Sequence, residues 1–94
     1  MRVKFFATIR NITGCAEADI PYRETAGALA RSLCDLYGEK LREKIFPGNV
    51  TGPEKFGPEI IILINGRHVS HLGGPAAALQ PDDRVDVFPV VAGG

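Results

Sequence analysis

The sequence has no excess of charge of either sign and no long apolar run. Its 11 basic and 11 acidic residues balance to a formal net charge of zero, and neither sign forms a long run. This balance gives no support for a nucleic-acid groove or an anionic membrane surface as the partner. No apolar stretch approaches the roughly 20 residues of a membrane span, and the first residues show no signal-peptide pattern. We therefore expect a cytoplasmic protein that binds neither nucleic acid nor membrane.

Cysteine is also scarce, which limits the metal and redox chemistry open to the chain. Cys15 and Cys34 lack CxxC spacing and a companion cluster, so we expect no zinc or other metal site. Cys34 falls inside a predicted helix, where a thiol packs as a small apolar group. Cys15 falls in a predicted loop and is the one candidate for an exposed, reactive thiol, although no basic residue or His stands next to it to lower its pKa.

What the sequence does contain is the pattern of one small domain. A chain of 94 residues is long enough for one hydrophobic core. Alternation and turn signals predict a strand over 2–9, a turn over 11–18, a strand over 17–22 and a helix capped by Thr25 that Gly38 can interrupt. A loop over 47–58 then precedes an apolar strand over 59–64. Asn65-Gly66 predicts a tight turn into a short strand over 67–69, and the last strand covers 84–88.

This element order predicts an α+β fold of the β-grasp, ubiquitin-like type. We expect a mixed sheet of four to five strands with one main helix packed on one face. The predicted domain spans 1–88, and residues 89–94 form a flexible tail after Pro89, which removes a ladder donor and ends the strand.

Two phenylalanines do not fit the core pattern of their strands. In the first strand Val3, Phe5 and Ala7 should face inward, which leaves Phe6 outward; in the last, Val85 and Val87 should face inward and Phe88 outward. The first and last strands of a β-grasp sheet are neighbours, so we expect Phe6 and Phe88 to form one exposed apolar patch. Either Ile60, Ile62 and Ile64 or Ile61 and Leu63 would extend it. Such a patch usually marks a protein partner. For one ring alone burial by a loop is the favoured interpretation, whereas both rings together beside a free tail favour an interface.

The last six residues, Pro89-Val90-Val91-Ala92-Gly93-Gly94, have no charge except the terminal carboxylate. Extended, they reach roughly 20 Å. Glycine has no Cβ, so Gly93 and Gly94 can pass through a channel too narrow for other residues. We take the Gly94 carboxylate as the working group, with a frayed terminus as the alternative that the tail alone leaves open.

Two remaining features have simpler explanations. His68 and His71 are the only histidines and stand three apart with no third ligand nearby in sequence, so we interpret them as surface polar residues. Gly73-Gly74 indicates a backbone bend and not a phosphate loop, because no helix with a Lys-Ser or Lys-Thr follows. The sequence contains no catalytic constellation of its own.

Four segments of the chain resemble the MoaD/ThiS family of ubiquitin-like sulfur carriers, over nearly the whole length and most specifically at the end: Lys4–Arg10, Ile64–Arg67, Pro81–Val85 and Phe88–Gly94. Residues 68–74 and the long loop before the third strand are more similar to the archaeal-type branch of MoaD. The departures are small. Val90 stands where the family often has a second proline, and Asp82 where it often has glycine.

The resemblance implies that an activating enzyme similar to MoeB adenylates Gly94 with ATP and Mg²⁺, after which sulfur replaces AMP to leave a thiocarboxylate. In MoaD relatives the acceptor is a molybdenum-cofactor precursor held by the MoaE subunit, into which the tail inserts. This chain would then bind no permanent cofactor and act as a sulfur-donating subunit of molybdopterin synthase. Gly93 and Gly94 would be the reacting end, and the partner-binding residues would be Phe6, Phe88, Pro89, Val90, Val91 and Ala92.

Two other functions are compatible with the same tail. One is a sulfur carrier for another pathway, such as thiazole, cysteine, a specialised metabolite or the pterin of a tungsten enzyme. The other is a protein modifier that is joined through Gly94 to lysines of its targets. The role of the 47–58 loop is left open.

Overall fold

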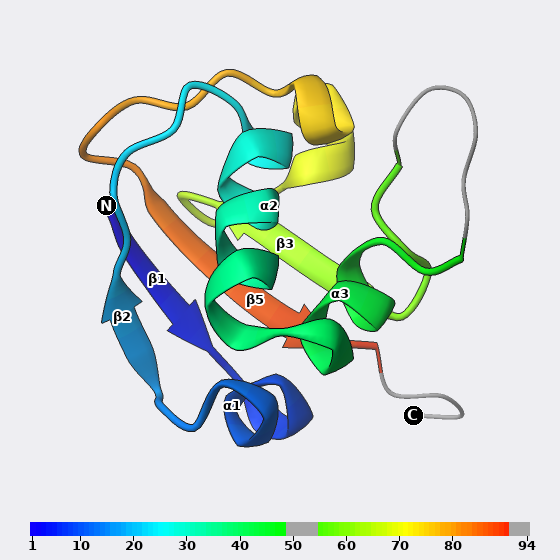
Figure 1. The fold of residues 1–94 in the computed structure, drawn as a ribbon. Coiled ribbons are helices and arrows are strands. Elements are labelled where there is room, and N and C mark those ends of the chain that lie inside the picture. Colours follow the sequence, from blue (N-terminus) through cyan, green and yellow to red (C-terminus); the bar gives the residue numbers. More distant parts are fainter. Residues whose placement is uncertain (49–54, 91–94) are drawn as a thin grey trace.

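The computed structural model describes residues 1–48 and 55–90. It confirms the predicted β-grasp fold, with a five-stranded mixed sheet in the order β2-β1-β5-β3-β4 and helices on one face (Figure 1). The elements in chain order are β1 (Arg2–Phe5), α1 (Ala7–Thr13), β2 (Glu17–Asp19), α2 (Ala26–Tyr37), α3 (Glu39–Ile45), β3 (Ile60–Ile64), β4 (Arg67–His68), the 3₁₀ turns η1 (Val69–Leu72) and η2 (Gly74–Ala76), and β5 (Arg84–Pro89).

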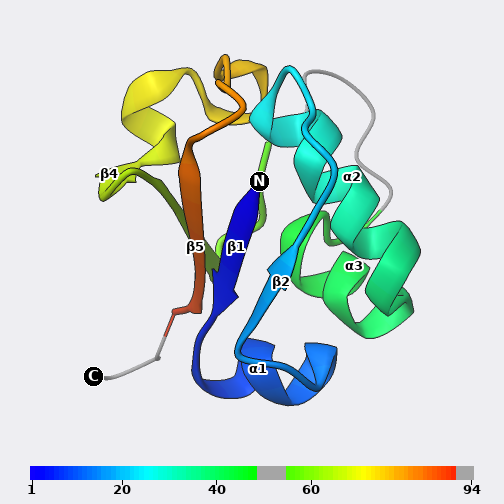
Figure 2. The ribbon, with the colours of Figure 1, turned by 90° about the vertical axis from the view of Figure 1, so that its left-hand side faces the viewer.

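The centre of the sheet is the parallel pair of β1 and β5, as expected for the first and last strands. Val3 lies opposite Val85 and Phe5 opposite Val87, and all four side chains are buried. β2 and β3 flank this pair and are antiparallel to their neighbours, and β4 is the edge strand beyond β3. Figure 2 shows the twist of β2, β1 and β5, with α2 and α3 to the right of these strands.

The first strand is shorter than predicted, and a helix follows it. β1 ends at Phe5, where the sequence predicted a strand through Ile9, and the predicted turn over 11–18 overlaps α1. The strand is broken at Ala7, whose φ of +52° lies in the left-handed region and whose side chain is exposed and not inward as predicted. Ile9 is still fully buried, because α1 turns it onto the core.

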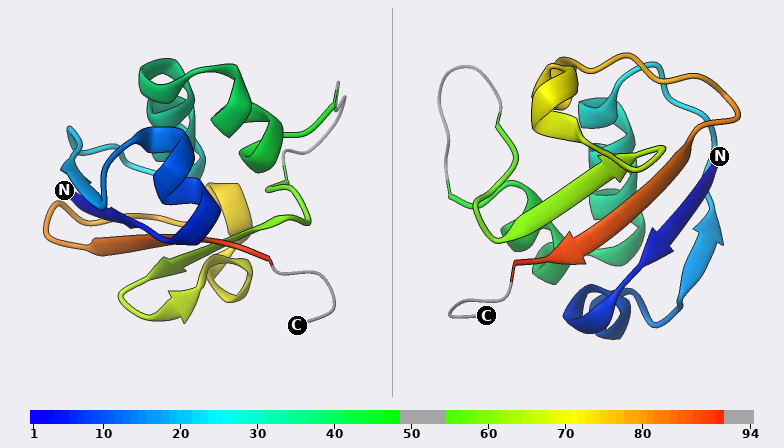
Figure 3. Two further views of the ribbon diagram at one scale, coloured as in Figure 1. Left: turned by 90° about the horizontal axis from the view of Figure 1, so that it is seen from below. Right: turned by 180° about the vertical axis from the view of Figure 1, so that it is seen from behind.

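The main helix, α2, begins as predicted. The Thr25 side chain accepts a hydrogen bond from the Ala28 backbone N–H at 3.2 Å and so caps the first turn. Leu29 and Leu33 bury the apolar stripe against the sheet. Gly38 ends α2 with a φ of +89°, which an L-residue rarely adopts, and α3 starts directly after it. Seen from below, both helices lie on one side of the sheet (Figure 3).

The Asn65-Gly66 turn is confirmed, and it is joined to the start of β5. Both residues have positive φ, +50° and +84°, as a tight hairpin turn requires. The Asn65 amide donates to Asp83 Oδ1 at 2.8 Å and accepts from the Arg84 backbone N–H at 2.9 Å. These bonds hold the turn against the residues that lead into the last strand.

The remaining strands differ from the prediction at their ends. β2 stops at Asp19 and not at Tyr22, and β4 stops at His68 because Val69 begins η1. β5 continues through Pro89, which lies opposite Ile60, although proline was expected to end it. The missing N–H of Pro89 falls at a position where the ladder toward β3 needs no donor.

The core lies between the sheet and the helices and is made of aliphatic side chains with Phe5. No polar or charged side chain is buried among the described residues, and no buried side-chain nitrogen or oxygen there lacks a partner. Of the helices that the structure describes, none has the length and apolar character that a membrane crossing requires.

Candidate functional site

Phe6 and Phe88 form a stacked pair on the outer face of the sheet. Their ring centroids are 4.2 Å apart and their planes are inclined by 7°. Both side chains are half-buried, each ring covering part of the other. The structure therefore brings together the two outward phenylalanines that the sequence singled out, and no loop buries either of them completely.

The backbone places this pair through the parallel register of β1 and β5. Phe5 lies opposite Val87, so the next residue of each strand, Phe6 and Phe88, points to the other face. The Phe6 backbone N–H donates to the Val87 carbonyl at 3.1 Å and continues the ladder one residue beyond β1. Phe6 itself keeps an extended backbone before Ala7 begins α1.

Two residues of β3 extend the pair. Ile61 lies opposite Phe88 in the antiparallel register, and Leu63 lies one pleat further along; both are half-buried. The alternative set, Ile60, Ile62 and Ile64, is buried against the helices. We call Phe6, Phe88, Ile61 and Leu63 the outer patch. These four residues lie on the sheet face that the helices leave open, and Figure 3 shows this open face from behind.

Charged residues border the outer patch. Asp86 lies opposite Leu63 on one side and Lys4 on the other, so an acidic and a basic residue share one row of the sheet. Lys4 is exposed and Asp86 half-buried. An apolar centre with a polar rim is the usual composition of a protein interface.

The outer patch lies where β5 leads into the tail. Pro89 is half-buried, and Val90, 45% exposed, donates its backbone N–H to the Glu59 carbonyl at 2.9 Å. The sheet therefore holds the chain through Val90, two residues further than the predicted domain boundary at 88. The predicted site residues Val91, Ala92, Gly93 and Gly94 lie outside the described residues, and their roles stay predictions.

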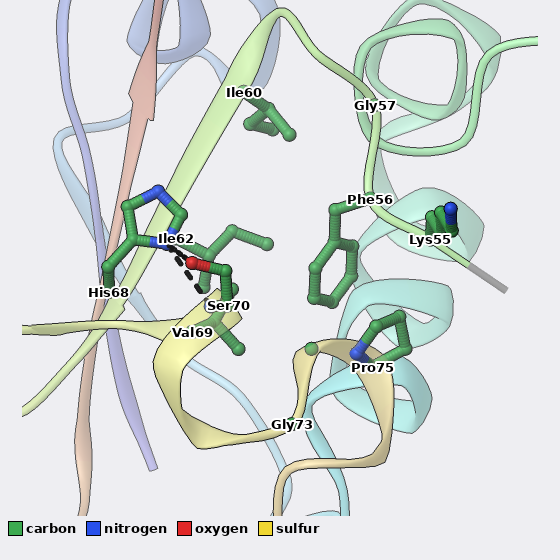
Figure 4. Close-up of a pocket in the computed structure, with 11 residues that line it drawn as sticks. Lys55, Phe56, Gly57, Ile60, Ile62, His68, Val69, Ser70, Gly73 and Pro75 are labelled. Carbon is green, nitrogen blue, oxygen red and sulfur yellow. Dashed lines mark hydrogen bonds between the residues drawn. The ribbon is translucent and has the colours of Figure 1, made fainter.

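The rings of the two histidines lie side by side. Their ring centroids are 5.9 Å apart. His68 Nδ1 accepts from the Ser70 backbone N–H at 3.1 Å and lies 2.8 Å from the Ser70 hydroxyl, so this nitrogen caps η1 (Figure 4). No group of three metal-ligating side chains occurs in the described part of the chain.

Neither cysteine has the environment of an activated nucleophile. Cys15 is half-buried, with its Sγ 3.7 Å from the Tyr37 hydroxyl. Burial raises the pKa of the Cys34 thiol, with a further contribution from the carboxylate of Asp35. Burial likewise raises the pKa of Tyr37, with the Cys15 contact adding to it. A raised thiol pKa lowers the fraction of reactive thiolate at neutral pH.

Sequence reasoning missed one feature, a cavity whose lining includes His68 and Ser70. The cavity, of about 470 Å³, lies between the β3 edge and the segment that precedes it, lined by Phe56, Ile60, Ile62, His68, Ser70 and Pro75 among others (Figure 4). Its lining comes from segments far apart in the chain, so no local pattern marks it.

Comparisons with known proteins identify the family. The family model described as the ThiS family matches residues 3–94. Small archaeal modifier protein 3 of Haloferax volcanii is 39% identical over 98 residues, which cover 100% of this chain and 98% of that protein.

Solved structures agree. The solution structure of small archaeal modifier protein 1 from Methanosarcina acetivorans superimposes with a TM-score of 0.84 at 33% identity, covering 99% of this chain and 94% of that one. A putative molybdopterin converting factor subunit 1 from Pyrococcus furiosus gives a TM-score of 0.68 at 28% identity, covering 96% and 95%. The β-grasp sheet, the outer patch at the end of β5 and the family match through residue 94 lead to one conclusion: the chain belongs to the MoaD/ThiS family of ubiquitin-like sulfur carriers and protein modifiers.

Proposed function

We propose that the carboxylate of Gly94 is activated and converted to a thiocarboxylate. The protein then donates sulfur from this thiocarboxylate as the small subunit of a molybdopterin-synthase-type complex. The single observation that carries the proposal is the position of the outer patch. The stacked Phe6 and Phe88 lie where β5 delivers the chain toward Gly93-Gly94, so a partner that covers the patch is placed to receive the tail.

The chemistry begins with a carboxylate that needs activation. A terminal carboxyl group has a pKa of about 3.3–3.7, so at neutral pH it is ionised and a poor electrophile. A MoeB-like activating enzyme, which supplies ATP and Mg²⁺, joins the Gly94 carboxylate oxygen to the α-phosphorus and releases pyrophosphate. The resulting acyl-adenylate carries AMP as a good leaving group. Since this step uses ATP, we place the protein in the cytoplasm.

Sulfur transfer then follows in three steps. Hydrosulfide attacks the Gly94 carbonyl carbon and displaces AMP, which leaves a thiocarboxylate. In the complex with a MoaE-like subunit, the thiocarboxylate sulfur attacks a carbon of the acceptor and displaces an oxygen leaving group from it. Water then cleaves the acyl–sulfur bond, which restores the Gly94 carboxylate and leaves the sulfur on the acceptor. The acid–base groups for these steps belong to the partners.

In the complexes with the activating enzyme and with the MoaE-like subunit, the residues of this chain bind the partner and position the tail. Phe6 and Phe88 supply the apolar contact, and Pro89 and Val90 fix where the tail leaves the sheet. Val91 and Ala92 then span the distance to the active site, and the glycines fit its narrow end. Val90, in place of a second proline, keeps the backbone N–H that donates to the Glu59 carbonyl.

The second candidate is protein modification, and the Haloferax relative at 39% identity, named a small archaeal modifier protein, favours it specifically. The activation step is the same. A lysine amine of a target then attacks the activated Gly94 carbonyl and forms an isopeptide bond in place of sulfur transfer. A sulfur carrier of another pathway shares the first two steps and differs only in the acceptor.

The identity of the partner that co-purifies with the protein distinguishes these functions. Affinity-tagged protein is purified from its native cells, with the tag at the N-terminus so that Gly94 stays free. A MoaE-like subunit in stoichiometric amount supports the synthase role, whereas target lysines that carry residues 85–94 after digestion with trypsin, which cleaves after Arg84, support modification. A tag-purified variant lacking Gly94 is the control, because it has lost the diglycine end while the folded domain is unchanged in sequence. If wild type and variant recover the same partners and neither recovers an activating enzyme or an adduct, the proposal fails.

A further inference from the structure

β3 is paired along its full length on one side and along two residues on the other. β5 lies opposite every residue from Ile60 to Ile64. β4 lies opposite Leu63 and Ile64 alone, because the chain leaves the sheet at Val69 to form η1. The stretch from Ile60 to Ile62 therefore lies at an open edge of the sheet, with no pairing strand among residues 1–48 and 55–90.

The backbone groups of Ile60 and Ile62 point out of this edge. The Val90 N–H bonds to the Glu59 carbonyl, and the Asn65 N–H bonds to the Arg84 carbonyl. In an antiparallel pair these bonds alternate along the strand, so residues 59, 61, 63 and 65 direct their groups to β5. The N–H and C=O groups of Ile60 and Ile62 consequently face away from β5, where an added strand would find them.

A cavity lies beside this edge. Its volume is about 470 Å³, within the size range of ligand pockets. Ile60 and Ile62 form one wall, with Phe56 facing them across the cavity and Val69 and Pro75 at one end (Figure 4). The cavity therefore offers an apolar pocket directly next to the open backbone groups.

The charge at the cavity has one sign. Among the described residues that line it, Lys55 alone has a formal charge, and its side chain is exposed at the rim. The described lining contains no aspartate or glutamate. The Ser70 hydroxyl and the His68 imidazole lie at the opposite rim, hydrogen-bonded to each other (Figure 4). An occupant with an apolar group for the pocket and an anionic group for Lys55 matches this distribution.

We propose that the open edge binds an extended peptide segment of a partner protein as a sixth strand. The segment forms main-chain hydrogen bonds to Ile60 and Ile62, buries one apolar side chain against Phe56, and places an aspartate or glutamate beside Lys55. Recognition by strand addition takes its affinity from main-chain bonds and its specificity from alternate side chains. A free amino acid or small carboxylate would not use the two open backbone positions.

This site is separate from the outer patch, yet adjacent to it. Ile60 and Ile62 are buried on the helix side of β3, whereas Ile61 and Leu63 belong to the outer patch on the other face. Ile60 also lies opposite Pro89, so a segment added to β3 is one strand away from the strand that leads to the tail. A partner can therefore bind the open edge while the outer patch and Gly94 contact an enzyme. Peptide binding at the open edge does not depend on the chemistry at Gly94.

The test begins with a phage-displayed library of random linear dodecapeptides selected on the full-length protein. The peptides enriched are synthesised and added to isotope-labelled protein, and backbone amide signals and their exchange with solvent are recorded by NMR. We expect an alternating pattern of apolar residues with an acidic residue at a fixed position. The amides of Ile60 and Ile62 should shift and exchange more slowly, whereas those of Ile61 and Leu63 should already be protected without peptide.

Variants separate the charge contact from general effects. Lys55→Glu should weaken the selected peptide roughly tenfold, as expected for reversing a charge beside an ion pair. Lys40→Glu, on α3 and outside the cavity lining, should leave its affinity unchanged. A peptide with proline in place of its central residue, which cannot donate to the edge, should bind more weakly than its alanine counterpart.

Four results would overturn the proposal. The selection could enrich no peptide over a blank surface, or the enriched peptides could shift the signals of Phe6 and Phe88 instead. Lys55→Glu and Lys40→Glu could change the affinity for the peptide equally. Finally, this chain itself could occupy the edge. The last would appear without peptide, either as shifts at Ile60 and Ile62 that grow with protein concentration or as shifts at these amides when residues 91–94 are deleted.

Discussion

Phe6 stacks on Phe88 with its ring centroid 4.2 Å away and the two planes 7° from parallel. Phe6 is the last extended residue before α1, and Phe88 lies one residue from the end of β5. One contact therefore ties the first helix to the strand that leads to the tail. Because both rings remain half-buried, the same contact contributes to stability and to the outer surface.

The coupling between the two rings can be measured in a double-mutant cycle. Phe6→Ala, Phe88→Ala and the double variant should give free energies of unfolding that are not additive, with a coupling of about 0.5–1.5 kcal/mol for a stacked aromatic pair. Urea denaturation at equilibrium supplies the values. Additive losses would show that the rings do not interact in solution.

The outer patch should contribute to binding of the activating enzyme. Phe88→Ala should weaken this complex by about 1–3 kcal/mol if the ring is an interface anchor, with titration calorimetry on the folded variant as the measurement. Leu36→Ala is the matched control, since Leu36 is 60% exposed on α2, away from the outer patch. A comparable loss in both variants, or a fall in melting temperature with unchanged binding, would contradict an interface role.

The helical state of residues 7–13 has a consequence for stability. Ile9 is fully buried and Ile12 is partly buried on the same helix. Ile9→Ala should therefore lower the free energy of unfolding by about 2–5 kcal/mol, and Ile12→Ala should cost less. Chemical denaturation compares them directly. The reverse order would mean that α1 packs on a different face.

This helix also shows where sequence reasoning reached its limit. Asn65-Gly66, the Thr25 cap and the alternation of Val85 and Val87 act through local chemistry, and each was predicted correctly. α1 was missed because Ile9 continues the alternation of β1, and because Thr8 and Ile9 are both β-branched and favour a strand. The helix forms because the core accepts Ile9 from that direction, which no local pattern records.

The residues of the candidate site were likewise predicted only in part. The alternation of two strands identified Phe6 and Phe88, and the fold supplied their adjacency. The choice between Ile61 with Leu63 and the alternative β3 set needed the sheet orientation, because an apolar run has no polar residue to mark its outer face. The open edge at Ile60 and Ile62 depends on where β4 ends, which the tertiary path at Val69 decides.

The Cys34 thiol should react slowly with iodoacetamide at neutral pH. Burial raises its pKa above the ordinary value of 9.0, so at any given pH a smaller fraction is thiolate. Because the thiol has the lower pKa in the unfolded chain, it ionises there at a lower pH than in the folded protein. The free energy of unfolding should therefore fall as the pH rises above 9.0, and not below it. Alkylation rates of the Cys15→Ser variant, followed against pH, give the pKa; a midpoint below 9.0 would contradict the burial effect.

The central claim is that Gly94 is the reacting group. Wild-type protein incubated with its activating enzyme, ATP, Mg²⁺ and a sulfur donor should gain about 16 Da by intact-mass spectrometry, the difference between sulfur and the oxygen that it replaces. The variant lacking Gly94 should keep the same melting temperature and show no gain. An unchanged mass for the wild type, or an equal gain in the variant, would contradict the account.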